Sequence, residues 1–210
     1  STVQANTTAG FSIVTYTGTN ANLTCGHGLG AVPKMIIIKD RDASKNWIVY
    51  HEAIGNDRSI ALNSTDAQTA VTDHFNYTTP TSSVFSLGPY SHVNASGDDY
   101  VAYCFAEIKG YSKFGSYTGN GSTDGTFIYT GFRPAWIMVK RLTSGAGWSI
   151  LDAKRNEFNP VDKLLQANVN NQEFTPYDVD FVSNGFKWRT TDSTHNQSGS
   201  SYIYMAFAEH

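Results

Sequence analysis

The sequence predicts an all-β protein, an antiparallel β-sandwich of jelly-roll or lectin-like type built from two tandem homologous halves. Three observations predict this fold. The 210 residues include 18 glycines, 12 tyrosines and 12 phenylalanines, a composition that favours strands and turns. Apolar runs are short and separated by turn residues, as in sandwiches and barrels. No segment keeps the 3.6-residue period of an amphipathic helix over three turns.

The second half of the chain repeats the first. Residues 16–18 (YTG) return as residues 117–119, and residues 93–107 (VNASGDDYVAYCFAE) return as residues 195–209 (HNQSGSSYIYMAFAE). We therefore place a first β-sandwich repeat at residues 1–109 and a second at residues 110–210. No linker rich in proline or serine separates them, which fits either two units packed end to end or two halves of one larger sandwich.

Each half is expected to contain the same series of short strands. The apolar run after Pro33 predicts a strand buried on both faces, and proline is tolerated at the first residue of a strand. The polar residues that follow predict a hairpin loop, and the glycines before it predict another loop. In the first half the expected strands cover residues 11–17, 33–39, 47–50, 60–62, 84–87 and 100–106. Their counterparts in the second half include residues 136–141, 148–151, 163–166, 181–182 (matched to 84–87) and 202–208.

Composition and motifs argue against several classes of function. A formal charge of −3 and a pI near 6.0 predict no binding to nucleic acid or to an anionic membrane. The six histidines lack metal-ligand spacing, so we expect no metal and no cofactor. There is no G-x-S-x-G motif, and Cys25 and Cys104 have no evident histidine partner. The two cysteines are either bridged or buried as free thiols.

Two pairs of acidic residues are candidates for acid–base chemistry. Asp98 and Asp99 resemble a calcium loop or a glycosidase pair, but the second half has serines in their place. Asp178 and Asp180 would point to the same face of a strand. No apolar wall beside them would separate their pKa values, so edge-strand charge is the simpler interpretation. We therefore predict that the protein is not an enzyme.

The aromatic residues divide into two groups. Those that recur in both halves are expected in the core, because a repeated core needs the same packing twice. They are Trp47 and Trp148, Tyr100 and Tyr202, and Phe105 and Phe207.

Aromatic residues that occur in only one half are candidates for ligand binding. Tyr90 lies in a loop, Tyr177 follows a proline, and Trp188 stands between two basic residues. Sugar rings stack on such side chains, and groups such as the Asp178 carboxylate supply hydrogen bonds. The alternative is that these are ordinary surface aromatics.

The repeated unit resembles a known family pattern. It runs G-[FY]-S-x-x-x-Y-T-G, then G-x-x-P-x-x-[IV]-x-[IV]-K, then W-x-[IV], and closes with N-x-S-G-x-x-Y-[IV]-x-x-x-F-A-E. These motifs fill residues 10–107 and again residues 110–209, with Lys113 as one extra residue. The pattern resembles a domain of unknown function that is common in tail and tail-fibre proteins of bacteriophages, often in tandem copies.

The resemblance implies a non-enzymatic structural protein of a bacteriophage virion, assembled in the host cytoplasm. It would be a tail-fibre or receptor-binding module that contacts a glycan or protein of the host cell surface. Other virion proteins and further copies of the chain are the implied partners, with a trimer expected by analogy. Two alternatives stay open. One is a capsid decoration, head-fibre or tail-assembly protein without receptor binding, and the other is a depolymerase that uses the acidic pairs.

Overall fold

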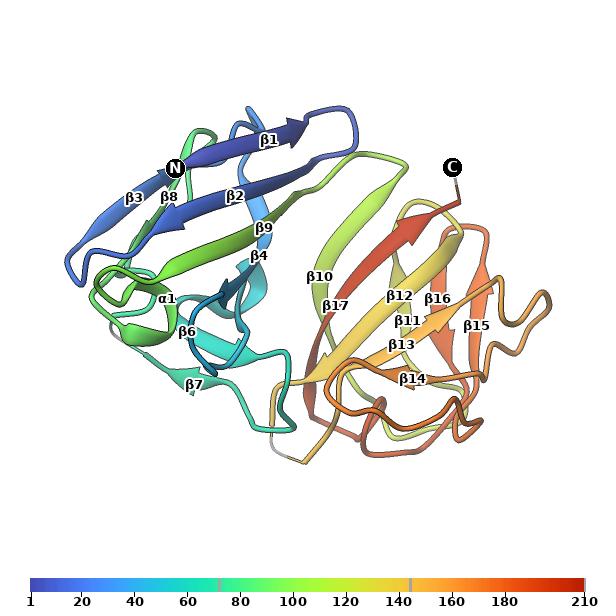
Figure 1. The fold of residues 1–210 in the computed structure, drawn as a ribbon. Coiled ribbons are helices and arrows are strands. Elements are labelled where there is room, and N and C mark those ends of the chain that lie inside the picture. Colours follow the sequence, from blue (N-terminus) through green and yellow to red (C-terminus); the bar gives the residue numbers. More distant parts are fainter. Residues whose placement is uncertain (72, 144, 210) are drawn as a thin grey trace. The chain divides into compact units, whose positions relative to one another are not determined.

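The computed structural model describes residues 1–71, 73–143 and 145–209, and most of its regular structure is β-strand (Figure 1). The chain divides into two compact units. Unit 1 contains Ser1–Asn63 and Gln68–Ile108, and unit 2 contains Ser64–Ala67 together with the chain from Lys109 onward. The strands pair antiparallel in every sheet. This confirms the prediction of an all-β protein with antiparallel sheets.

Unit 1 has a seven-stranded sheet and a two-stranded sheet. The larger sheet has the order β1-β2-β9-β4-β5-β6-β7, and the smaller one pairs β3 with β8. The strands of the larger sheet are β1 (Thr2–Asn6), β2 (Phe11–Thr17), β4 (Pro33–Asp40), β5 (Ile48–His51), β6 (Gly55–Ala61), β7 (Thr69–Ala70) and β9 (Asp99–Ala106). The smaller sheet contains β3 (Leu23–Gly26) and β8 (Val84–Leu87), and the two short helices of this unit are η1 (Glu52–Ile54) and α1 (Ser91–Asn94).

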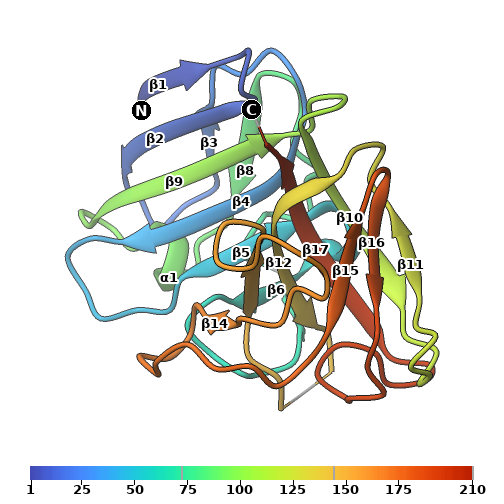
Figure 2. The same ribbon diagram turned by 90° about the vertical axis from the view of Figure 1, so that its right-hand side faces the viewer.

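Unit 2 has a five-stranded sheet and a three-stranded sheet. Their orders are β10-β17-β12-β13-β14 and β11-β16-β15, and both can be followed in Figures 1 and 2. The larger sheet contains β10 (Ser112–Thr118), β12 (Pro134–Arg141), β13 (Ser149–Asp152), β14 (Leu165–Gln166) and β17 (Ser201–Ala208). The smaller sheet contains β11 (Phe127–Tyr129), β15 (Val179–Val182) and β16 (Gly185–Trp188).

The core of each unit takes side chains from both of its sheets, since both sheets have an apolar face to remove from water. In unit 1 the core cluster includes Ile36 and Cys104 from the larger sheet and Phe85 from the smaller one. Cys25 lies in the same cluster, and both cysteines are free and buried. In unit 2 the cluster includes Ile137, Ala206 and Phe186 from the corresponding strands.

A proline begins the central strand of each larger sheet. Pro33 opens β4 and Pro134 opens β12, and in both strands the pairing register shifts immediately after the proline. Proline has no N–H group to donate to the ladder, so it is tolerated at such an irregularity near the start of a strand. The two units therefore share this local departure from regular pairing.

The predicted match between residues 84–87 and residues 181–182 is wrong. The ring of Phe85 in β8 lies edge-on to Tyr16 at 6.4 Å, and in unit 2 Phe186 in β16 lies edge-on to Tyr117 at 6.3 Å. The counterpart of β8 is therefore β16, and residues 181–182 belong to the additional strand β15 beside it.

Half of the predicted core aromatics are buried. Trp148, Tyr100 and Tyr202 are at most 2% exposed. Trp47, Phe105 and Phe207 are only partly buried, so their assignment to the core is wrong. In β9 the side chains alternate, and the face that carries Tyr100 and Cys104 packs into the core while Phe105 lies on the other face.

A buried asparagine of the closing motif holds the loops of unit 1 together. The side chain of Asn94 is 0% exposed. Its Oδ1 accepts a hydrogen bond from the backbone N–H of Thr19 at 2.8 Å. Its Nδ2 donates to the backbone oxygens of Ala21 at 2.6 Å and Gly88 at 3.0 Å. One amide thus satisfies buried or partly buried backbone groups from two separate loops.

Asn196 does the same in unit 2. Its Oδ1 accepts from the backbone N–H of Asn120 at 3.0 Å, and its Nδ2 donates to the backbone oxygens of Ser122 and Thr190, each at 2.8 Å. In each unit the tyrosine of the closing motif holds the turn that follows the asparagine through a hydrogen bond. Tyr202 Oη accepts from the backbone N–H of Gln197 at 2.9 Å, as Tyr100 Oη does from the residue after Asn94.

The glycine of the Y-T-G motif allows the hairpin before β9 to lie close to the backbone at the end of β2. Gly18 donates its N–H to the backbone oxygen of Asp98 at 2.8 Å and accepts from the N–H of Gly97 at 3.0 Å. A Cβ atom on Gly18 would lie 1.9 Å from the backbone oxygen of Ala95. At Gly119 in unit 2 the corresponding distance to a backbone oxygen is 2.4 Å. The Y-T-G motif and the closing N-x-S-G motif therefore meet in each unit through the same close contact between two stretches of backbone.

We predict that Gly18→Ala destabilises the protein. The added methyl group would collide with backbone and force the hairpin away, at a cost of about 1–3 kcal/mol in the free energy of unfolding. The control is Gly26→Ala, since the nearest atom to its added Cβ lies at 3.9 Å. The control should change stability by less than about 0.5 kcal/mol. Chemical denaturation measures both, and equal stabilities would contradict the prediction.

Candidate functional site

The candidate residues Tyr90 and Tyr177 are half-buried and packed against histidines. The ring of Tyr90 lies 3.9 Å from that of His74 and 4.9 Å from that of His92. The ring of Tyr177 lies 4.8 Å from that of His195. Tyr90 belongs to unit 1 and Tyr177 to unit 2, so the structure places them in different units.

Trp188 is a core residue, which corrects its prediction as a ligand contact. Its side chain is 0% exposed and belongs to the core cluster of unit 2. The reason is the alternation of β16, in which Phe186 and Trp188 point inward and Lys187 points outward. The basic residues on either side of Trp188 therefore indicate a strand with one face exposed to solvent. Trp188 lies on the opposite face, which packs into the core.

The two acids of the 178–180 segment have different environments. Asp178 is exposed and lies just before β15, where its backbone oxygen accepts a hydrogen bond from the N–H of Arg189 at 2.9 Å. Asp180 lies within β15, and its Oδ2 accepts from Nε of Arg189 at 2.6 Å. The arginine thus binds the backbone of one acid and the carboxylate of the other.

The outer face of the three-stranded sheet in unit 2 carries two exposed aromatic side chains. Phe127 is 43% exposed and Tyr129 is 63% exposed, whereas Ile128 between them is 5% exposed and packs in the core. We call the surface formed by Phe127, Tyr129, Lys187 and Asp180 the aromatic face. Its strands lie side by side in Figure 2.

Strand pairing places these side chains in rows. Lys187 is paired with Phe127 on one side and with Asp180 on the other, so the three side chains share one row. In the next row Tyr129 is paired with Gly185. A Cβ atom on Gly185 would lie 2.9 Å from Cε2 of Phe127 and 2.0 Å from the backbone oxygen of Ile128. Gly185 is itself buried, and its lack of a Cβ atom leaves room for the ring of Phe127 beside it.

Four charged groups lie on or beside the aromatic face and pair with one another. Lys187 Nζ lies 2.6 Å from Oδ1 of Asp124, and Nη1 of Arg189 lies 3.5 Å from the same oxygen. Arg189 also pairs with Asp180 at 2.6 Å. The hydrogen bond from Lys187, together with its charge, lowers the pKa of Asp124. Two positive and two negative groups therefore surround the rings, and pairs this exposed contribute little to stability.

Unit 1 has no such aromatic pair at the corresponding place. Cys25 in β3 is paired with Phe85 as Ile128 in β11 is paired with Phe186. The residues that flank Cys25 are Thr24 and Gly26. Our sequence analysis missed Phe127 and Tyr129, because three apolar residues in succession do not reveal which of them faces solvent. Their absence from the first half was the signal that could have identified them.

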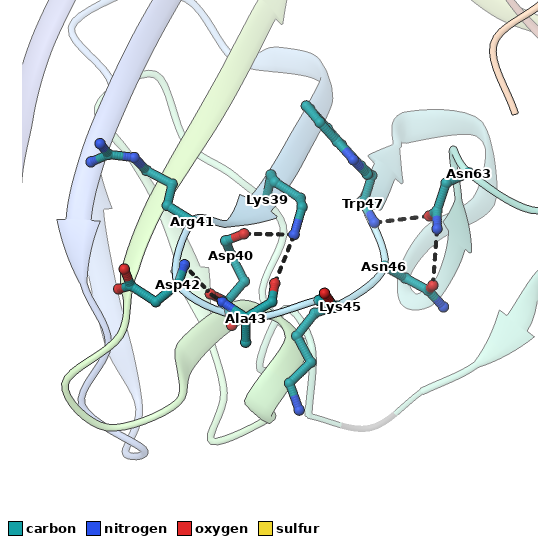
Figure 3. A pocket seen from close by; sticks show the side chains of 10 residues that line it. Lys39, Asp40, Arg41, Asp42, Ala43, Lys45, Asn46, Trp47 and Asn63 are labelled. Atoms are coloured by element: carbon teal, nitrogen blue, oxygen red, sulfur yellow. Dashed lines mark hydrogen bonds between the residues drawn. The ribbon is translucent and has the colours of Figure 1, made fainter. Parts of the chain in front are cut away.

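Unit 1 has a hollow at the loop that joins strands β4 and β5, which we call the β4–β5 pocket (Figure 3). Its volume is about 710 Å³, and it is lined by residues 39–47 and Asn63. Asn63 Oδ1 accepts from the backbone N–H of Trp47 at 3.0 Å, and its Nδ2 donates to Oδ1 of Asn46 at 3.1 Å. Lys39 Nζ donates to the backbone oxygens of Asp40 at 2.6 Å and Ala43 at 3.0 Å.

A buried histidine lies beneath Tyr177 and Trp188. His195 is 1% exposed, and its ring stacks on Trp188 at 4.4 Å. Neither ring nitrogen has a hydrogen-bond partner among the described residues. Burial lowers the pKa of His195 to about 3, against the opposing effect of Asp192, whose Oδ1 lies 4.0 Å away. In unit 1 the corresponding residue is Val93, whose backbone oxygen likewise accepts from a core tyrosine hydroxyl.

We predict that His195→Val reduces the acid sensitivity of unit 2. The pKa of His195 in the folded protein is about 3, whereas an exposed histidine titrates near 6.5. As the pH falls below about 6.5, the unfolded chain therefore binds a proton at this histidine while the folded unit does not. The free energy of unfolding decreases as a result.

The test compares unfolding near pH 7 and near pH 4.5. His195→Val should remove about 2 kcal/mol of the pH-dependent loss in the free energy of unfolding. Thermal or urea unfolding of both proteins at the two pH values measures this difference. The same loss in the variant and in the unaltered protein would contradict the prediction.

Comparison with known proteins identifies the family of the chain. A family model described as a domain of unknown function (DUF7483) matches residues 1–210. Neither a curated protein nor a solved structure matches the chain. In the part of the chain that the structure describes, no group of three or more histidine, cysteine, aspartate or glutamate side chains is arranged to hold a metal ion. The same residues include no helix with the length and apolar character needed to cross a membrane. The match over all 210 residues makes the chain a member of the DUF7483 family of domains of unknown function.

Proposed function

We propose that this protein is a non-enzymatic structural protein of a bacteriophage virion, and that it contacts a glycan of the host cell surface through the aromatic face of unit 2. The virion assignment rests on the resemblance of the repeated motifs to domains of phage tail and tail-fibre proteins. The binding assignment rests on the chemistry of the aromatic face.

One observation carries the binding proposal. Phe127 and Tyr129 are exposed side by side on one strand, and unit 1 has only Thr24 and Gly26 at the corresponding positions. Exposed aromatic rings suit the C–H faces of sugar rings. Lys187 borders the rings and can exchange its pairing with Asp124 for hydrogen bonds to hydroxyl groups. The balanced charges around the face favour a neutral ligand over a strongly acidic one.

The surroundings of the acids support a binding role over catalysis. A glycosidase needs one carboxyl group whose pKa is raised by an apolar pocket, next to a second that stays ionised. Asp180 instead accepts a short hydrogen bond from Arg189, and Asp178 is exposed to solvent. Neither environment is the apolar pocket that the general acid of a glycosidase needs.

We also infer that each unit is a β-sandwich of jelly-roll or lectin-like type and that the units are two copies of one repeat. The core clusters support the first inference, since each takes side chains from both sheets of its unit. The hydrogen bonds of Asn94 and Asn196 support the second, because each amide accepts from one backbone N–H and donates to two backbone oxygens.

We predict that the double substitution Phe127→Ala and Tyr129→Ala weakens glycan binding by about tenfold or more, since stacked aromatic contacts contribute roughly 1–2 kcal/mol. Its thermal stability should change little, because both rings are exposed. The control is Tyr77→Ala, which removes another exposed ring that is 57% accessible and lies in unit 1.

Glycan-array binding and adsorption to host cells measure the effect. Unchanged binding by the double variant would contradict the assignment of the face, and absence of binding by the unaltered protein would contradict the proposed function. Release of reducing ends from host capsule would contradict the non-enzymatic part, and Asp180→Asn would then test the depolymerase alternative.

A further inference from the structure

We propose that the β4–β5 pocket of unit 1 binds residues 169–172 of a second copy of this chain, so that copies associate head to tail. The proposal goes beyond glycan binding and does not depend on it. It follows from a comparison of this pocket with the corresponding place in unit 2, where a segment of chain is already bound.

In unit 2 the segment Ser64–Ala67 is bound at the place that corresponds to the β4–β5 pocket. The side chain of Lys140 is 0% exposed, and its Nζ donates to the backbone oxygens of Asp66 at 3.0 Å and Thr65 at 3.4 Å. The N–H of Gly145, in the loop after β12, donates to the backbone oxygen of Thr65 at 3.2 Å. Ser64–Ala67 is therefore held against this loop through its backbone.

The corresponding residues in unit 1 are identified by strand pairing and by one side-chain contact. Lys39 in β4 and Lys140 in β12 occupy the same place relative to the strands β9 and β17. At the far end of the loop, Asn63 Oδ1 accepts from the N–H of Trp47 at 3.0 Å. In unit 2 the pair is Asn168 Oδ1 and the N–H of Trp148, at 2.8 Å. The loops 40–46 and 141–147 thus start and end at matching points.

In unit 1 no described segment of chain is bound at the corresponding place beside Lys39. Lys39 is only partly buried, and its ammonium group turns to the backbone oxygen of Ala43 in its own loop (Figure 3). A cavity of about 710 Å³ lies beside it. A bound segment would offer Lys39 backbone oxygens as Ser64–Ala67 offers them to Lys140. Recognition through backbone carbonyls tolerates different side chains.

The occupant follows from the same correspondence. Because Asn168 matches Asn63, residues 169–172 match Ser64–Ala67. These four residues are exposed and take part in no hydrogen bond among the described residues. Val169 is an apolar side chain that is 42% exposed. One chain therefore offers an open pocket in unit 1 and an unpaired matching segment in unit 2.

A pocket and a segment on different surfaces make a heterologous contact. Each copy binds the next through a surface that differs from the one it presents, so association continues until a ring closes or a filament forms. Such association would display several aromatic faces at once, which multiplies weak glycan contacts.

Cross-linking between two variants tests the contact directly. Ser44 corresponds to Gly145 and residue 170 to Thr65, and in unit 2 these two backbones are hydrogen-bonded. With oxidised glutathione added as the oxidant, a mixture of the full-length Ser44→Cys and Asn170→Cys proteins should therefore form a disulfide between copies. The native thiols of Cys25 and Cys104 are buried, which raises their pKa values to about 11 and about 12 and leaves them unreactive near neutral pH.

The control mixture pairs Ser44→Cys with Ser82→Cys, an exposed position that belongs to unit 1 and not to the segment 169–172. We expect the 44–170 dimer to form at least about tenfold faster than the control dimer, since docking holds the two thiols at high effective concentration. Mass spectrometry of the peptides identifies the bond. Equal rates in the two mixtures would overturn the proposal.

Sedimentation velocity supplies a second, independent test. The unaltered chain should associate as its concentration rises to about 100 µM, whereas Ser44→Trp, which fills the pocket, should remain monomeric. Asn170→Trp blocks the contact from the segment side, so the test survives if one variant fails to fold. Ser82→Trp, at an exposed position that does not line the pocket, is the control that should still associate. A monomeric unaltered chain, or association that persists in both blocking variants, would overturn the proposal.

Discussion

The hydrogen bonds of one buried asparagine in each unit are the constraint on which the surrounding loops depend. Asn94 and Asn196 each bind one backbone N–H and at least two backbone oxygens from separate loops. A buried backbone group without a partner costs about 1–3 kcal/mol, so losing the amide would leave several such groups unpaired at once. The hairpin that follows can reach this position only because Gly18 and Gly119 have no Cβ atom in its path.

This arrangement gives the repeated motifs a structural role. Their asparagine, glycine and tyrosine residues join loops to the sheets. The units differ at surfaces that these motifs do not form. In β11 the exposed positions hold Phe127 and Tyr129, and beside β4 a pocket lies open that unit 2 fills. We therefore expect function to depend on the surfaces in which the two units differ.

Much of the strand content could be predicted from the sequence, because apolar alternation and turn residues act locally. The assignment of particular aromatics was less successful. Trp188 was predicted to bind a ligand and lies in the core, while Phe105 and Phe207 were predicted in the core and are only partly buried. A strand turns alternate side chains to opposite faces, so a shift of one residue exchanges core for solvent. The pairing register decides this, and it depends on neighbours distant in the sequence.

The sequence by itself determined the all-β class and the recurring Asn, Gly and Tyr positions, because the period of apolar residues and the properties of turn residues are local. Only the tertiary structure decided which aromatic side chains meet water, since that follows from pairing between β11, β16 and β15. It also decided that Lys140 is covered by Ser64–Ala67 while Lys39 borders an open pocket. Both lysines stand in similar stretches of sequence, and they differ in which remote backbone oxygens come within reach.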